Sequence, residues 1–186
     1  MNLQKVKFVK NYSTVKNINM KILDMCCGSK MFWYNKNEPH TTYIDIRHEI
    51  DVIKDRGHLR KVGINPDIQA DWKKLPFERN TFDLIIFDPP HLINAGKSSW
   101  LKIKYGTLNK DHPLQDIRVG FEQAMKVLKP NGIILFKWNQ EQIPFRKVLD
   151  ELAKDKIYPI LGDRRSKTKW TVFLKTEVAT KKHDQK

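Results

Sequence analysis

The hydrophobic positions of the chain fall into short apolar runs that alternate with amphipathic stretches. The runs are rich in Ile, Leu and Phe on both faces, as expected for strands buried inside a parallel sheet. We predict strands over residues 21–25, 43–46, 67–70, 83–87, 132–138, 157–161 and 170–174. Hydrophobic residues at helical spacing predict helices over 115–129 and 142–154. This alternation predicts an α/β doubly wound sheet with right-handed crossovers.

Acidic residues gather where the predicted strands end. Ligands of doubly wound sheets bind beyond the C-terminal ends of the strands. Four successive strand ends carry Asp24, Asp45, Asp71 and Asp88. Buried carboxylates are costly unless they are paired or hydrogen-bonded, so the set indicates one binding crevice. Asp45 follows Asp24 by 21 residues, near the spacing at which an acid binds a ribose diol in dinucleotide-binding folds.

The turn after the first strand contains few glycines. It reads Met-Cys-Cys-Gly-Ser over residues 25–29, with Gly28 alone and no GxGxxG pattern. A pyrophosphate cradle needs more exposed backbone N–H groups than such a turn offers. A nucleoside without phosphates therefore fits this turn better.

The fourth strand ends abruptly in the sequence DLIIFDPPHL, residues 83–92. Two consecutive prolines cannot extend a central strand, because neither has an N–H for the ladder. The strand end thus presents an acid and an imidazole, Asp88 and His91, on a rigid corner. A plain strand terminator is the alternative interpretation of the prolines.

These motifs together resemble those of class I S-adenosylmethionine-dependent methyltransferases. ILDMCCGS resembles their first motif, YIDIR their second-strand acid, ADWKKLPF their third-strand acid, and VLKPNGIILF their helix-to-strand turn. DPPH resembles the [DNS]-P-P-[YFWH] motif of methyltransferases that act on amino nitrogens of bases. The chain is similar, over about residues 20–175, to small phage- and prophage-type methyltransferases with CCGS-x-MFW, DPPH and FKWN.

The resemblance implies a three-layer, Rossmann-like, mostly parallel seven-stranded sheet whose last strand is antiparallel. It implies S-adenosylmethionine as cofactor, S-adenosylhomocysteine as product, and no metal. The turn over 26–29 and Asp24 would hold the methionine moiety, Asp45 the ribose hydroxyls, and Asp71 the adenine amine. The family's GxGxG turn is here CCGSK, which departs from the pattern. The implied cofactor-binding residues are Asp24, Cys26, Cys27, Gly28, Ser29, Asp45, Ile46, Arg47, Asp71, Trp72 and Asp88.

An exocyclic base amine is a poor nucleophile, because its lone pair is delocalised into the ring. Two acceptors aimed at its N–H bonds would offset the positive charge that develops on attack. Asp88 and the Pro89 carbonyl can supply them, with Pro90 fixing the corner. His91 can stack on the base or form a hydrogen bond. We interpret Cys26 and Cys27 as small packing residues, which argues against a cysteine-based C5-pyrimidine mechanism.

The charge balance points to a polyanionic partner. Lys and Arg number 35 against 21 Asp and Glu, a formal net charge of +14, and nucleic acid is the commonest such partner. The alternative is that these charges are ordinary solvated surface side chains with no binding role. The loop over 91–113 would overhang the site, as a nucleic-acid contact or as a cofactor lid. A basic turn follows the strand over 157–161. The candidate contacts are Lys97, Trp100, Lys102, Lys104, Tyr105, Arg164, Arg165, Lys167 and Lys169.

We divide the chain into a basic segment over 1–19, one methyltransferase domain over 20–176 and a basic, disordered tail over 177–186. No signal segment or membrane span is apparent, and we expect a cytoplasmic protein in a bacterial or phage-infected cell. The expected function is methyl transfer to a base amine of nucleic acid, with DNA favoured over RNA. The alternatives are an RNA base methyltransferase, a non-catalytic cofactor-binding protein and a small-molecule methyltransferase.

Overall fold

The computed structural model describes residues 19–55, 57–96, 99–163 and 165–176, without the side chains of 53–55. Two candidate contacts, Lys97 and Arg164, lie outside these residues. So do the predicted tail over 177–186 and nearly all of the N-terminal segment. The strands of the main sheet are β1 (Ile22–Asp24), β2 (Thr41–Asp45), β5 (Ile68–Gln69), β6 (Phe82–Phe87), β7 (Leu128–Asn139), β8 (Pro159–Gly162) and β9 (Thr168–Leu174).

The seven strands lie in the order β5-β2-β1-β6-β7-β9-β8. The pairs among β5, β2, β1, β6 and β7 are parallel, and β9 is antiparallel to both β7 and β8. The predicted sheet and its antiparallel last strand are therefore confirmed. The chain builds β2 and β5 on one side of β1 and then β6 and β7 on the other. The strand order reverses between β1 and β6, which is where ligands of such sheets bind.

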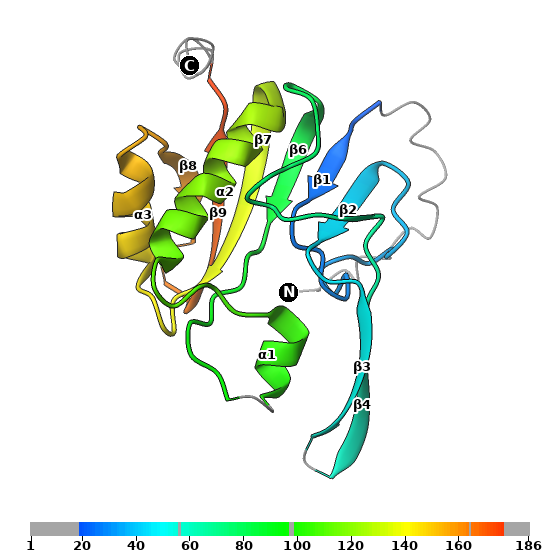
Figure 1. Ribbon diagram of the computed structural model, residues 1–186. Coiled ribbons are helices and arrows are strands. Elements are labelled where there is room, and N and C mark those ends of the chain that lie inside the picture. The colour runs from blue at the N-terminus through cyan, green and yellow to red at the C-terminus, as the bar shows by residue number, and fades with distance from the viewer. Residues whose placement is uncertain (1–18, 56, 97–98, 164, 177–186) are drawn as a thin grey trace, which may run out of the picture.

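Two helices, α2 (Pro113–Val127) and α3 (Phe145–Ala153), pack together and lie on one face of the sheet (Figure 1). The apolar stripe of α2 explains its docking, because Ile117, Phe121 and Ala124 are fully buried. Phe121 meets Phe136 of β7 and Phe173 of β9 at ring-centroid distances of 5.0 and 4.8 Å. The described residues thus supply the sheet and one helical layer.

Two elements were not predicted. A hairpin of β3 (Glu49–Asp55) and β4 (His58–Ile64) follows β2, and a short helix, α1 (Trp100–Tyr105), lies within the predicted long loop. The Ser99 side chain caps α1 by accepting a hydrogen bond from the Lys102 amide. Figure 1 shows the hairpin projecting away from the sheet, with α1 beside it, beyond the C-terminal ends of the central strands.

None of the described helices has the length and apolar character that a membrane crossing requires.

Candidate functional site

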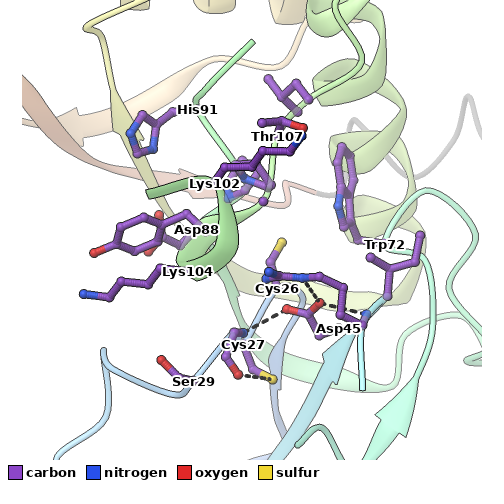
Figure 2. A pocket seen from close by; sticks show the side chains of 18 of the residues that line it. Cys26, Cys27, Ser29, Asp45, Trp72, Asp88, His91, Lys102, Lys104 and Thr107 are labelled. Carbon is purple, nitrogen blue, oxygen red and sulfur yellow. Dashed lines mark hydrogen bonds and ion pairs between the residues drawn. The ribbon is translucent and has the colours of Figure 1, made fainter. Parts of the chain in front are cut away.

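One cavity of about 910 Å³ lies beyond the C-terminal ends of the strands. Asp24, Asp45, Asp71 and Asp88 all line it, so the four predicted strand-end acids do meet. A volume of this size holds a nucleoside-sized ligand together with a second group. In Figure 2, Asp45 and Cys27 lie toward one end of the cavity and His91 toward the other.

Asp24 is buried at the end of β1, and its carboxylate has two donors. The Trp33 indole Nε1 donates to Oδ2 at 2.7 Å, and the Cys26 amide donates to Oδ1 at 3.2 Å. Burial nevertheless raises the pKa of Asp24 to about 7, with the Asp88 and Asp45 carboxylates adding to the rise. Near neutral pH this group is poised to ionise when a cation comes close.

Asp45 organises the turn after β1. Its Oδ2 accepts the Gly28 amide at 2.9 Å, and its Oδ1 accepts the Arg47 amide and Nε at 3.0 and 3.2 Å. A carboxylate has about four acceptor sites, which leaves room for a further donor such as a ribose hydroxyl. Gly28 has φ +49°, and a Cβ there would lie 3.8 Å from the Lys104 carbonyl oxygen. The single glycine of the turn therefore stands where the backbone needs it.

Asp71 and Trp72 differ in what they offer to the cavity. Asp71 is partly exposed, and its Oδ1 accepts the Lys73 amide at 2.8 Å. The Trp72 ring packs into the core against Phe87, at a ring-centroid distance of 5.3 Å. The Trp72 backbone, more than its ring, therefore remains for a ligand.

The corner after β6 holds Asp88 beside a lysine. The Lys137 Nζ lies 2.5 Å from the Asp88 Oδ2, and both side chains are 27% exposed. Burial raises the pKa of Asp88, and Lys137 opposes that rise. Burial also lowers the pKa of His91, whose ring lies 6.1 Å from the Tyr105 ring. Burial thus disfavours charge on both Asp88 and His91, while the contact with Lys137 favours the ionised form of Asp88.

The two cysteines line the cavity as thiols. Cys27 is buried, and its Sγ–H donates to the Gly28 carbonyl oxygen at 3.6 Å. Burial raises the pKa of both the Cys26 and Cys27 thiols, and nearby carboxylates raise them further. Since the thiolate is the nucleophile, the structure favours a packing role for both residues. Ser29, Ile46 and Arg47 complete the predicted lining on this side of the cavity.

Helix α1 covers the cavity. Lys102, Lys104 and Tyr105 line it, as predicted for a nucleic-acid contact or a lid. The Arg47 Nη1 donates to the Ile103 carbonyl oxygen at 2.9 Å, and this bond ties the helix to the end of β2. Trp100 lies at the far end of the helix, toward the hairpin, with the Lys104 Nζ 5.8 Å from its ring centroid.

The second basic cluster reaches the cavity edge. Because β8 runs parallel to β7, its exit lies on the cavity side, and Thr168 lines the cavity. Arg165 and Lys167 are exposed, and the Lys167 Nζ lies 2.9 Å from Glu141. Lys169 does not fit its predicted role as a nucleic-acid contact, since it is only 5% exposed. It shares the alternating buried face of β9 with Phe173, so it cannot present its charge with the others.

Several residues that line the cavity, or that contact its lining, were not predicted. Lys137 lies near the end of the strand predicted over 132–138, but no role was predicted for it. The acids Glu49 and Asp51 belong to the unpredicted hairpin. Trp33 lies in the loop after β1, within the stretch CCGSKMFW, and only the fold reveals its bond to Asp24. The FKWN stretch that holds Lys137 was the one available signal for that residue.

Neither family models nor the sequences of curated proteins match the chain. Solved structures do match its fold. The PH0226 protein of Pyrococcus horikoshii OT3 has a TM-score of 0.54 and 17% identity, with 84% of this chain and 82% of that chain covered.

Two further neighbours are methyltransferases by description. A SAM-dependent methyltransferase of Methanosarcina mazei has a TM-score of 0.53 and 11% identity, covering 84% of this chain and 92% of its own. The N-methyltransferase NodS of Bradyrhizobium japonicum WM9, in complex with S-adenosylhomocysteine, has a TM-score of 0.51 and 15% identity, covering 85% and 79%. At these identities the likeness establishes the fold, which is that of SAM-dependent methyltransferases.

Proposed function

We propose that the protein is an S-adenosylmethionine-dependent methyltransferase that acts on an exocyclic amino group of a base in nucleic acid. DNA is the favoured substrate, at N6 of adenine or N4 of cytosine, and the cytoplasm is the expected compartment. The observation that carries this proposal is the meeting of the Asp88-Pro89-Pro90-His91 corner with Asp45 and Asp71 in one nucleoside-sized cavity.

The residues present fit the cofactor. Asp45 keeps acceptor capacity for a ribose hydroxyl beyond its bonds to Gly28 and Arg47. Asp71 is partly exposed in the cavity and can accept from the adenine amine. Asp24, with its pKa raised to about 7, would balance the ammonium of the methionine moiety. S-adenosylmethionine supplies, when bound, a methyl group on a sulfonium.

The catalytic residues would then act on the amine of the base. The Lys137 contact is made to the Oδ2 of Asp88, and this leaves Oδ1 to accept one N–H of the amine. The Pro89 carbonyl would take the other N–H, in a direction that the proline ring fixes. The C–N bond would form as the methyl–sulfur bond breaks, and the positive charge would pass from the sulfonium to the nitrogen. The Asp88 carboxylate would offset this charge until the nitrogen releases a proton to solvent. The neutral His91 ring beside Tyr105 can stack on the base face.

The charge distribution supports a polyanionic substrate. Lys102 and Lys104 of α1 line the cavity, and Arg165 and Lys167 are exposed beyond its edge at Thr168. A small, uncharged substrate would give these cations no role. A macromolecular phosphate backbone would engage all of them.

The test uses purified protein, radiolabelled S-adenosylmethionine, and DNA and RNA of mixed sequence. Labelled nucleic acid, digested to nucleosides and identified by mass, gives the base and separates DNA from RNA. Nucleic acid left unlabelled by protein that binds S-adenosylhomocysteine would reject the proposal. It would support instead the non-catalytic cofactor-binding role that the single-glycine turn suggests.

Two substitutions separate the roles of the acids. We expect Asp88→Ala to abolish methyl transfer while S-adenosylhomocysteine affinity stays within a few fold, and Asp45→Ala to weaken that affinity. Asp83→Ala is the matched control, because Asp83 lies at the start of β6, whereas Asp88 directly follows its end, and Asp83 also pairs with a lysine of β7, Lys129, at 2.8 Å. Equal loss of cofactor affinity in the Asp88 and Asp45 variants would contradict the separation.

A further inference from the structure

Cations and aromatic rings form a continuous track from the hairpin to the catalytic corner. The Arg60 guanidinium of β4 lies 5.2 Å from the Trp100 ring centroid. The Lys104 Nζ lies 5.8 Å from the Trp100 centroid and 5.0 Å from the Tyr105 centroid. The Tyr105 ring in turn lies 6.1 Å from the His91 ring. The track therefore joins β4, α1 and the end of β6.

The strand register assigns the two faces of the hairpin. Residues directly opposite one another in an antiparallel pair share a face, and neighbours along a strand alternate. Glu49 is opposite Ile64 and Asp51 is opposite Val62, so these four residues and Arg60 share one face. Glu49 and Asp51 line the cavity, which makes this the cavity face.

The other face of the hairpin points away from the cavity. It carries Lys61 together with Ile50, Val52 and Leu59, and these three apolar side chains are 60–77% exposed. Arg60 and Lys61 are thus adjacent cations of one strand on opposite faces. This difference makes Lys61 a built-in control for Arg60.

The position of the hairpin limits the path of a substrate strand. Figure 1 shows the hairpin and α1 side by side, beyond the C-terminal ends of the central strands. A base that reaches Asp88 lies under α1, since Lys102, Lys104 and Tyr105 line the same cavity. We expect the nucleotides next to that base to leave the cavity past α1, where Trp100 and Arg60 lie together.

We propose that Arg60 and Trp100 form a clamp for the single-stranded nucleotides that flank the target base, and that the hairpin is the arm that recognises them. This inference rests on the proposed function. Arg60 would contact a phosphate, and Trp100 would stack on a base, as aromatic rings do when they bind single strands. The acids Glu49 and Asp51 lie on the same face, farther from the tip, so the phosphates would pass on the tip side of them.

The test uses fluorescence anisotropy to measure the binding of a fluorescein-labelled, mixed-sequence single-stranded DNA of about 20 nucleotides. We expect Arg60→Ala to weaken binding about tenfold and to reduce the slope of log affinity against log salt by about 0.7. Trp100→Ala should weaken binding about tenfold with the salt slope unchanged. Lys61→Ala removes the same charge from the other face and should change affinity less than threefold.

Two further measurements guard against a general loss of structure. Each variant should bind S-adenosylhomocysteine with wild-type affinity by calorimetry. In methyl transfer, Arg60→Ala should raise KM for the oligonucleotide while kcat at saturation stays within about twofold. Trp100→Phe should restore most of the Trp100→Ala loss if the ring stacks on a base.

The outcomes distinguish this inference from the proposed function. Equal effects of Arg60→Ala and Lys61→Ala would reject the clamp, because net charge would then explain both. Wild-type affinity in the Arg60 and Trp100 variants of an active enzyme would reject the clamp alone. A wild-type protein that neither binds nor methylates nucleic acid would reject the proposed function, and the clamp with it.

Discussion

At the scale of single residues, the proposed reaction makes Asp88 depend on a neighbouring lysine. Lys137 lies 2.5 Å from Asp88, and its Nζ is also 5.5 Å from the Trp170 ring centroid. The pairing opposes the rise in pKa that burial imposes on Asp88. A protonated Asp88 could not accept from Lys137 at Oδ2 and from the amine at Oδ1 while also offsetting the charge on the nitrogen, so the proposed reaction needs this carboxylate ionised. We therefore assign Lys137 a positioning role that acts through Asp88.

We expect Lys137→Met to lower kcat at pH 7 by at least about tenfold, the effect of losing one charged hydrogen bond. The direction of the pH effect follows because the proposed reaction uses the ionised form of Asp88. Without the cation its pKa rises further, so activity lost at neutral pH should return as the pH increases. The acidic limb of the kcat profile should move up by about one pH unit, and Lys137→Arg should move it less.

Lys129→Met is the matched control for that experiment. Lys129 is another lysine of β7 that pairs with an aspartate, with its Nζ 2.8 Å from the Oδ1 of Asp83 in β6, and it lies at the other end of the strands. Its loss should leave the pH profile of kcat unchanged. A limb that stays in place in Lys137→Met would show that Lys137 does not act through the ionisation of Asp88.

Asp24 predicts a pH dependence of cofactor binding. Its pKa of about 7 lies above the usual value of 3.8, so the carboxyl is neutral below pH 7 and ionised above it. Only the ionised form balances the cofactor ammonium. We expect S-adenosylhomocysteine affinity to fall toward about tenfold per pH unit as the pH drops from 7 to 5.5. Calorimetry over this range should show a flat profile for Asp24→Asn, and an equal slope in both proteins would contradict the assignment.

At the scale of elements, burial decides what the sequence could predict. The strands β1, β6 and β7 carry apolar residues that the core needs, and their runs predicted them. Helix α1 has six residues and none of them is buried, so it shows no apolar stripe. The hairpin exposes Ile50, Val52 and Leu59, which gives its apolar residues no fixed inward face. Both missed elements contribute side chains to the cavity, with Glu49 and Asp51 from the hairpin and Lys102, Lys104 and Tyr105 from α1.

The candidate site likewise contains residues that the sequence could predict and residues that it could not. Asp24, Asp45, Asp71 and Asp88 were predicted to meet because strand ends of one sheet share an edge, and they do line one cavity. The Trp33 bond to Asp24 depends on the path of an irregular loop, which no periodicity encodes. Lys169 was predicted to be exposed because it is charged. Its charge does not reveal the register of β9, which turns this side chain toward the buried face.

The packing of α2 on the sheet depends on Gly120. A Cβ at this position would lie 2.5 Å from the Trp72 ring and 2.7 Å from the Phe87 ring. Alanine in a helix normally gains up to about 1 kcal/mol over glycine, whereas overpacking a core costs about 1–3 kcal/mol. We expect the clash to win, because both rings are held in the core.

Gly120→Ala should therefore lower Tm by about 2–6 °C in a thermal melt. It should also weaken S-adenosylhomocysteine binding, since Trp72 adjoins Asp71 at the cavity. Gly63→Ala is the control, because a Cβ there meets nothing within 4 Å. An unchanged or raised Tm in Gly120→Ala would show that Trp72 can move aside at little cost.

At the scale of the whole molecule, five cations lie around one opening in a chain whose net charge is +14. Lys102 and Lys104 line the cavity, Arg60 lies at its hairpin side, and Arg165 and Lys167 lie near its edge at Thr168. Cations gathered in this way can follow a phosphate backbone past the site. The proposed cofactor binding has no such requirement, since it would depend on carboxylates inside the cavity.

The two kinds of binding should therefore respond differently to salt. If the five cations each contact a phosphate of a single strand, log affinity should fall against log salt with a slope of about 3.5. Raising the salt from about 50 to about 200 mM should then weaken nucleic-acid binding about a hundredfold. S-adenosylhomocysteine affinity, measured by calorimetry over the same range, should change less than twofold. A flat salt response of oligonucleotide binding would mean that the basic surface does not contact phosphates, and it would favour a protein partner for this face.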